Sequence, residues 1–206
     1  MGKNCEPGAL IIVDLQSDFL PGGSLAVPGG EEVIDVLNGY IDTFVQREWP
    51  IFATRDWHPP NHCSFKAQGG LWPEHCVMNT PGARFSPALR LPAFASIISK
   101  GTDPKRDAYS GFEGTDLEER LRKMSVPRLY VGGLATDYCV LNTVKDGLQR
   151  GFEVKLLEDA IRAVNLKPGD GSAAIKEMVD LGAIPLERRE RMRAEQRSDE
   201  EKQFRD

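Results

Sequence analysis

The residues best suited to nucleophilic chemistry are an acid, an amine and a thiol that follow short apolar runs. Asp14 ends the run Ala9–Asp14, Lys100 follows the run at residues 94–99, and Cys139 comes soon after the run at residues 128–131. In an open parallel sheet, ligands bind at the carboxyl ends of the strands, so we expect the three side chains at one edge. Asp14 can take the thiol proton and Lys100 can hold both charges, a combination that suits acyl transfer.

The segment that carries Cys139 strengthens this prediction. Residues 132–139 read GGLATDYC, which predicts a Gly-Gly turn between a strand and a helix over residues 136–150. Cys139 would lie in the first turn of that helix, where unpaired N–H groups and the helix dipole favour an anion. Two backbone N–H groups, one from the turn and one from the helix start, can form an oxyanion hole. Each signal alone is weak, and the prediction depends on the shared position at strand ends.

A second group of residues has the composition of a metal site. All three histidines, His58, His62 and His75, lie within eighteen residues, and Asp56 is two residues before His58. In an extended segment residues two apart point to the same side, so Asp56 and His58 can bind one cation, and His75 can complete the set. Two imidazoles and a carboxylate with open positions suit a catalytic Zn²⁺, Fe²⁺ or Mn²⁺.

The same segment allows other interpretations. The pairs His62-Cys63 and His75-Cys76 could form a closed structural zinc site with two thiolates and two imidazoles, although the usual CxxC spacing is absent. Surface histidines that bind no metal are a further alternative. Aromatic side chains near the cluster, which more often belong to a core, can wall a pocket for a flat ring: Phe19, Trp72 and Tyr109.

The pattern of the chain predicts how these residues are positioned. Apolar runs at residues 9–14, 50–54, 94–99, 128–131 and 152–157 predict strands, and a short segment at 183–185 can add another. Apolar residues at helical spacing predict helices over residues 31–48, 115–124, 136–150 and 171–181. Alternating strands and helices predict an α/β fold of three layers, α/β/α, with a mostly parallel sheet. The irregular segment at residues 55–92 is long enough to be functional.

Composition narrows the class of partner. The net charge is −5 and no basic block stands apart from acids, which argues against nucleic acid and anionic membranes as partners. No apolar run reaches the roughly 20 residues of a membrane span, and the first residues lack the pattern of a signal peptide. We therefore expect a cytoplasmic protein with a small polar substrate. We expect one domain over residues 1–186 and a charged tail over residues 187–206, helical or disordered.

Several motifs together resemble a known family. The segments DLQSDFLPGGSLAVPGG, TRDWHPPNHCSF, WPEHCVMNTPGARF, ISKG, YSGF and GGLATDYCV are similar to those of nicotinamidases in the isochorismatase-like cysteine hydrolase superfamily. The resemblance is collinear from about residue 9 to residue 181. Carbamoyl-type amidases of the superfamily lack the metal loop and isochorismatases lack the cysteine, whereas this chain has both.

The resemblance implies a six-stranded parallel sheet and a role for each motif residue. It implies a triad of Asp14, Lys100 and Cys139, a metal on Asp56, His58 and His75 with His62 or Ser64 as a further ligand, and a cis bond between Leu134 and Ala135. The N–H groups of Ala135 and Cys139 would then face the oxyanion. Residues expected to contact the substrate are Phe19, Trp72, Tyr109, Leu134, Ala135 and Tyr138; some members carry His where this chain has Tyr138.

The resulting hypothesis is hydrolysis of nicotinamide to nicotinate and ammonia through a Cys139 thioester. The pyridine nitrogen would bind a divalent metal, for which we expect zinc, with iron or manganese as alternatives. The reaction would serve NAD salvage. A homo-oligomer is compatible with the sequence. One alternative is hydrolysis of another small heteroaromatic amide. The other is a non-catalytic member in which a zinc loop serves stability or binding.

Overall fold

The computed structural model describes residues 8–186 and contains one parallel sheet of six strands. The strands are β1 (Gly8–Val13), β2 (Ile51–Asp56), β3 (Ser96–Lys100), β4 (Arg128–Leu134), β5 (Glu153–Arg162) and β6 (Ile184–Leu186), in the order β3-β2-β1-β4-β5-β6. The predicted α/β class with about six parallel strands is confirmed. The tail predicted over residues 187–206, and with it the proposed domain division, lies outside the described residues.

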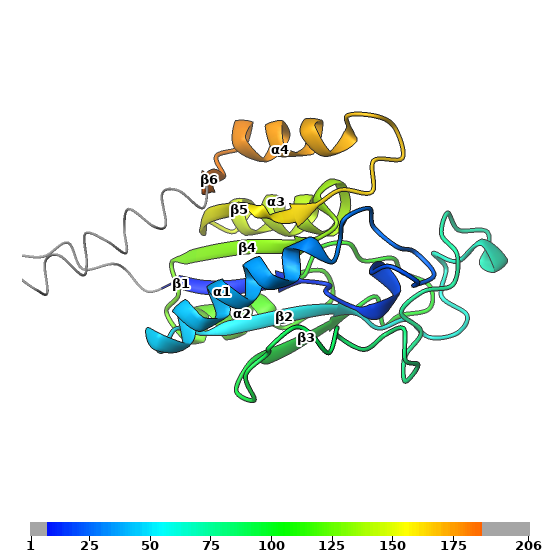
Figure 1. The fold of residues 1–206 in the computed structure, drawn as a ribbon, viewed down its shortest axis with the longest axis horizontal. Helices are drawn as coiled ribbons and strands as arrows, with labels where there is room; N and C mark the ends of the chain where they lie inside the picture. The colour runs from blue at the N-terminus through cyan, green and yellow to red at the C-terminus, as the bar shows by residue number, and fades with distance from the viewer. Residues whose placement is uncertain (1–7, 187–206) are drawn as a thin grey trace, which may run out of the picture.

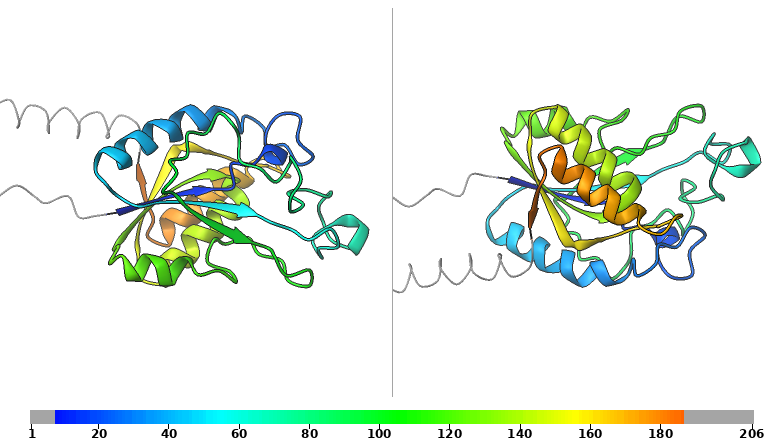
Figure 2. Two further views of the ribbon diagram at one scale, coloured as in Figure 1. Left: turned by 90° about the horizontal axis from the view of Figure 1, so that it is seen from below. Right: turned by 90° about the horizontal axis from the view of Figure 1, so that it is seen from above.

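Helices cover both faces of the sheet (Figures 1 and 2). Helix α1 (Glu32–Gln46) lies on one face, and α2 (Leu117–Lys123), α3 (Leu141–Gln149) and α4 (Asp170–Asp180) lie on the other. Successive residues of β1 alternate between these layers, so Leu10 and Ile12 pack in the core on the α1 side while Ile11 and Val13 pack in the core on the opposite side. The continuous apolar sequence of β1 follows from burial on both faces.

The carboxyl ends of β1 to β4 lead into the loops that carry the predicted site residues. Short 3₁₀ turns interrupt these loops at Ser17–Phe19 and Lys66–Gln68. The long connection from β2 to β3 extends from this end of the sheet, at the right in Figure 1. Among the described residues, none of the helices combines the length and hydropathy that a bilayer crossing requires.

The segment before Cys139 differs from its prediction. Gly132 and Gly133 are the fifth and sixth residues of β4 rather than a turn. A Cβ on Gly133, whose φ is 127°, would lie 2.1 Å from the carbonyl oxygen of Val13 in the neighbouring strand. These glycines therefore serve close strand packing. The predicted helix over residues 136–150 is confirmed as a continuous helical segment, in which a π-helical turn at Thr136–Val140 leads directly into α3.

The observed bounds of two strands, β3 and β5, also differ from the predicted ones for local reasons. The third strand begins at Ser96 rather than at residue 94, because Ala95 N donates to Pro92 O in a turn and leaves Phe94 exposed. Strand β5 continues to Arg162, five residues beyond the predicted end, because Ile161 and Arg162 pair with the end of β4 after an irregularity in register. This extension brings the next loop to the carboxyl edge of the sheet.

Candidate active site

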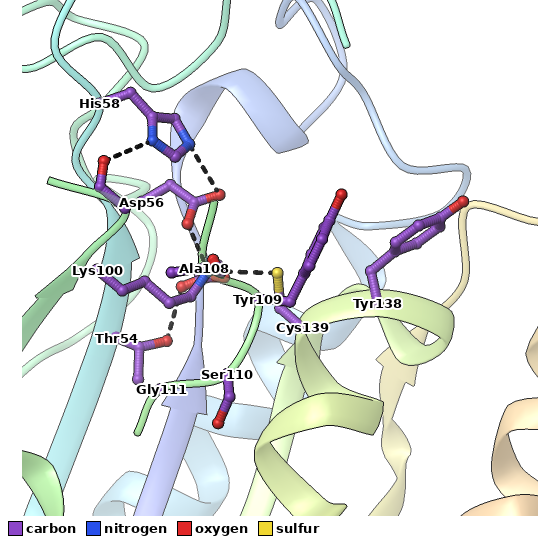
Figure 3. Close-up of polar contacts among 12 residues, drawn as sticks. Thr54, Asp56, His58, Lys100, Ala108, Tyr109, Ser110, Gly111, Tyr138 and Cys139 are labelled. Atoms are coloured by element: carbon purple, nitrogen blue, oxygen red, sulfur yellow. Dashed lines mark hydrogen bonds and ion pairs between the residues drawn. The ribbon is translucent and has the colours of Figure 1, made fainter. Parts of the chain in front are cut away.

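Lys100 is the centre of a buried cluster formed by three neighbouring strands and the turn after β4. Its ammonium lies 2.9 Å from Asp14 Oδ2, contacts Asp56 Oδ1, and lies 3.3 Å from both the Ala108 carbonyl oxygen and Cys139 Sγ. Figure 3 shows Lys100 between Asp56 and Cys139. The side chains of Lys100 and Asp14 are fully buried. The structure thus brings together the acid, amine and thiol that the sequence placed at strand ends.

Asp14 is oriented by its backbone and by a neighbouring hydroxyl. It follows β1 with a φ of 51°, in the left-handed region that Asp tolerates better than most residues. Thr54 Oγ1 donates to Asp14 Oδ1 at 2.6 Å, while Asp14 Oδ2 faces the Lys100 ammonium. One carboxylate oxygen of Asp14, one of Asp56 and the sulfur of Cys139 lie within 4.8 Å of one another. Asp14 is therefore close enough to exchange a proton with the thiol through a small movement.

Burial and charge oppose each other in this cluster. Burial raises the pKa of Asp14 although the Lys100 ammonium lowers it. Burial also raises the pKa of the Cys139 thiol well above its usual range, again against the effect of Lys100. Burial alone would lower the pKa of Lys100, but the carboxylates of Asp14 and Asp56 raise it well above its usual value. The resting cluster therefore holds a protonated thiol beside a charged ammonium.

The predicted metal ligands form a second group that shares Asp56 with the first. Asp56 Oδ2 lies 3.6 Å from His58 Nε2 and 3.9 Å from His75 Nε2. The Nδ1 of His58 donates to Gly101 O at 2.9 Å, and the Nδ1 of His75 donates to Pro73 O at 2.8 Å. Each ring therefore carries its proton on Nδ1 and directs Nε2 toward the carboxylate, the arrangement that metal-ligating histidines commonly have. These residues fit a divalent metal ion.

Charge supports the same fit. Burial would raise the pKa of Asp56, but Lys100, His58 and His75 outweigh it and hold the pKa below its usual value. Burial would lower the pKa of His58, but the Asp56 carboxylate raises it overall, whereas burial prevails at His75 and lowers its pKa. A buried carboxylate that attracts protons onto an adjacent imidazole attracts a metal cation by the same force.

The structure also bears on two other predictions, that His62 is a further metal ligand and that His62, Cys63, His75 and Cys76 form a closed zinc site. His62 stacks on His58 with ring centroids 4.1 Å apart, but its Nδ1 is 2.7 Å from Ser64 Oγ and its Nε2 is 3.1 Å from Arg106 O. In this arrangement His62 and Ser64 pair with each other. Among residues 8–186, no group of three possible ligands includes His62, Cys63 or Cys76, which argues against the closed structural zinc site.

A narrow apolar cavity connects the two groups. Asp56 and His75 of the second group and Cys139 of the first all line it. Trp72 Nε1 donates to Tyr109 Oη at 2.9 Å, and Tyr138 packs edge-on against Trp72 with ring centroids 5.0 Å apart. All six predicted substrate contacts line this cavity: Phe19, Trp72, Tyr109, Leu134, Ala135 and Tyr138. The bond between Leu134 and Ala135 is cis, as the resemblance implies.

Sequence reasoning missed several residues of the site. Leu25, Val27 and Val164 complete the apolar wall, but isolated apolar residues in loops give no signal of a pocket. Thr54 donates a hydrogen bond to the Asp14 carboxylate, and the side-chain amide of Gln16 bonds the backbone N–H and carbonyl of Asp56. The position of Gln16, two residues after Asp14, was the only signal that could have identified it.

The chain belongs to the isochorismatase family, because the model of the isochorismatase domain matches residues 8–190. Among its relatives, the nicotinamidase of Escherichia coli (strain K12) is 42% identical over 198 residues, covering 86% of this chain and 93% of that protein. The pyrazinamidase of Pyrococcus horikoshii, crystallised in complex with zinc, is 52% identical with a TM-score of 0.84, covering 87% of this chain and 98% of that one. An L. infantum protein in complex with nicotinate is 40% identical with a TM-score of 0.82, covering 88% and 92%.

Proposed function

We propose that this chain is a nicotinamidase, an amidohydrolase that converts nicotinamide to nicotinate and ammonia. The observation that carries the proposal is that one apolar cavity is lined by Cys139 and by Asp56 and His75, two of the three residues of the metal-ligand group. Nicotinamide has a carboxamide and a ring nitrogen on the same flat ring, and this cavity offers a partner to each. The zinc-bound and nicotinate-bound relatives support the same function.

The metal is part of the proposal. Asp56, His58 and His75 would hold it, and their donor set suits zinc, with iron or manganese as alternatives. When bound, the metal would coordinate the pyridine nitrogen and so orient the ring. Phe19 and Trp72, both lining the cavity, would pack against the ring faces. The enzyme would thereby favour heteroaromatic amides over benzamide.

The chemical steps are assigned to residues of this chain. Asp14 takes the proton of the Cys139 thiol, and the thiolate attacks the carboxamide carbon. The N–H groups of Ala135 and Cys139 stabilise the tetrahedral oxyanion. Asp14 returns the proton to the nitrogen as the carbon–nitrogen bond breaks, which releases ammonia and leaves a thioester on Cys139. Asp14 then deprotonates a water molecule, whose attack releases nicotinate and restores the thiol.

Lys100 keeps this sequence of steps electrostatically feasible. Its ammonium contacts Asp14 and lies 3.3 Å from the Cys139 sulfur, so it faces negative charge whether the proton is on the thiol or on the carboxylate. The charge near Lys100 therefore changes little during the proton transfer, which lowers the cost of forming a thiolate in a buried site.

The proposed setting is the cytoplasm, where the product would enter NAD salvage. The thiols of Cys63, Cys76 and Cys139 are all free, which supports a reducing compartment. A homo-oligomer stays a prediction.

Ammonia release from nicotinamide, pyrazinamide and benzamide tests the substrate class. We expect release from the two heteroaromatic amides and little from benzamide, which has no ring nitrogen. Equal turnover of benzamide would remove the proposed role of the ring nitrogen, and turnover of pyrazinamide without nicotinamide would reassign the enzyme to another heteroaromatic amide.

A further inference from the structure

The pairing between β1 and β2 continues past the end of β1 through a side chain. Leu10 N donates to Pro50 O at 3.0 Å and Asp14 N donates to Thr54 O at 3.2 Å. The same spacing would next bring the backbone N–H of Gln16 to the carbonyl of Asp56. The backbone instead turns at Asp14, and Gln16 N donates to Asp14 O at 2.8 Å. Both backbone hydrogen-bonding groups of Asp56 on this side would then lack a strand partner.

The side-chain amide of Gln16 takes the place of the missing peptide group. Its Nε2 donates to Asp56 O at 2.7 Å, and its Oε1 accepts from Asp56 N at 2.7 Å. Nε2 also donates to Ala83 O at 3.0 Å. Gln16 is completely buried, so water cannot replace these bonds without a rearrangement.

This arrangement matters because Asp56 belongs to both groups of the site. Its Oδ2 faces the two imidazoles of the metal-ligand group, and its Oδ1 contacts Lys100. On the far side the strand is held by β3, with Asp56 in register with Lys100 and Trp57 N donating to Lys100 O at 3.0 Å. Gln16 supplies the hydrogen bonds on the near side.

We propose that Gln16 is a positioning residue that fixes the backbone of Asp56, so that its loss weakens metal binding and slows hydrolysis together. The inference rests on the metal site of the proposed function. It differs from a purely structural role, in which loss of Gln16 would lower stability without a selective effect on the metal.

Asn38 offers a matched control in the same chain. It is also buried, and its amide makes two backbone bonds, donating to Ala88 O at 3.0 Å and accepting from Arg90 N at 2.8 Å. It joins α1 to a loop and has no contact with Asp56 among these bonds. Removing the Asn38 amide takes away two part-buried hydrogen bonds and removing the Gln16 amide takes away three buried ones, so both changes should lower stability, with the larger loss in the Gln16 variant.

The experiment compares Gln16→Met and Asn38→Leu with the parent protein. Zn²⁺ affinity is measured by competition with a chromogenic chelator, together with the melting temperature and the kcat and KM for nicotinamide over a range of Zn²⁺. Both variants should melt earlier. Gln16→Met should bind Zn²⁺ about 10- to 100-fold more weakly, as is typical when a partner of a metal ligand is lost, and its kcat should rise as Zn²⁺ is added. Asn38→Leu should bind Zn²⁺ like the parent.

Parent-like Zn²⁺ affinity in Gln16→Met, or an equal loss in both variants, would overturn the proposal. If Gln16→Met does not accumulate as folded protein, Gln16→Asn, whose amide is one methylene too short to make both bonds, decides by the same criterion. A parent protein that binds no Zn²⁺ would overturn the proposal as well. The affinity measurement uses no substrate, so failure to release ammonia would remove the proposed function and leave this test valid.

Discussion

At the residue scale, a single lysine links the two halves of the site. Lys100 contacts the carboxylates of Asp14 and Asp56 and lies beside Cys139, and its side chain has no exposure to solvent. Breaking such a buried pair leaves charges uncompensated, so its effect is much larger than that of a surface pair. We therefore expect Lys100 to contribute both to stability and to the proposed chemistry.

Replacing Lys100 with Met should lower the free energy of unfolding by about 3–5 kcal/mol, because two buried carboxylates lose their counter-charge. Activity should fall to background at temperatures where the variant stays folded. Urea unfolding and ammonia release measure the two effects. Lys145→Met is the control, since Lys145 pairs with Glu177 on the surface at 2.6 Å and its loss should cost no more than about 1 kcal/mol. Equal effects of the two substitutions would contradict this account.

Sequence reasoning located the chemically reactive residues better than their supports. Asp14, Lys100 and Cys139 could be found because strand ends converge at one edge of a parallel sheet; their roles stay predictions. Thr54 and Gln16 gave no comparable signal, because a buried polar residue in or after a strand is recognised only from its partners. The raised pKa of Cys139 could not be predicted from the sequence either. A position at a helix start predicts a lowered thiol pKa, whereas the burial of the thiol, which only the structure shows, raises it.

At the element scale, the turn after β3 holds His58, a proposed metal ligand, by close approach. Gly101 has a φ of 63°, its carbonyl accepts from His58 Nδ1 at 2.9 Å, and a Cβ at this position would lie 2.4 Å from the His58 ring. Only glycine satisfies the conformation and the approach together. The turn thus sets the orientation of His58.

Gly101→Ala should therefore lose bound metal and activity. Gly114→Ala is the control for backbone strain. Gly114 has a φ of 66°, close to that of Gly101, but an added Cβ there would have no atom within 4 Å and so would clash with nothing. Both changes place alanine in the left-handed region at a cost of about 1–2 kcal/mol, but only Gly101→Ala displaces a ligand. Elemental analysis of the purified variants gives the metal content, and full metal retention by Gly101→Ala would refute the assigned role of the turn.

Helices and strands were predicted well where the spacing of apolar residues indicated them, and less well where the prediction depended on glycine. The strand at residues 9–14 and the helix at 31–48 were confirmed to within one or two residues of β1 and α1. Gly132 and Gly133 suggested a turn, but the close neighbouring strand requires glycine inside β4. Sequence pattern alone does not separate these two uses of glycine.

At the scale of the whole molecule, the metal-ligand group joins the end of β2 to two points of the long connection that follows it. His58 and His75 lie in the long connection between β2 and β3, and His58 N donates to Cys76 O at 3.0 Å. The rest of the fold has a separate core on each face of the sheet. A bound metal should therefore stabilise the native state without being required for folding.

Removing metal with a chelator should abolish activity, keep the far-ultraviolet circular dichroism spectrum, and lower the melting temperature modestly. At a free metal concentration of 100 times Kd, the metal contributes about 2.7 kcal/mol to stability. Calorimetry with and without chelator measures this change, and added Zn²⁺ should restore it. Loss of the circular dichroism signal on chelation would instead indicate that folding depends on the metal, as in a closed structural zinc site.

The central claim is that Cys139 is the nucleophile of an amidohydrolase, and ammonia release by Cys139→Ala tests it most directly. The control is Cys63→Ala, which removes another free thiol outside the cavity. The account predicts that Cys139→Ala releases ammonia from nicotinamide only at the background rate while it binds Zn²⁺ and melts like the parent, and that Cys63→Ala stays active. A Cys139→Ala protein that releases ammonia at the parent rate would contradict the account.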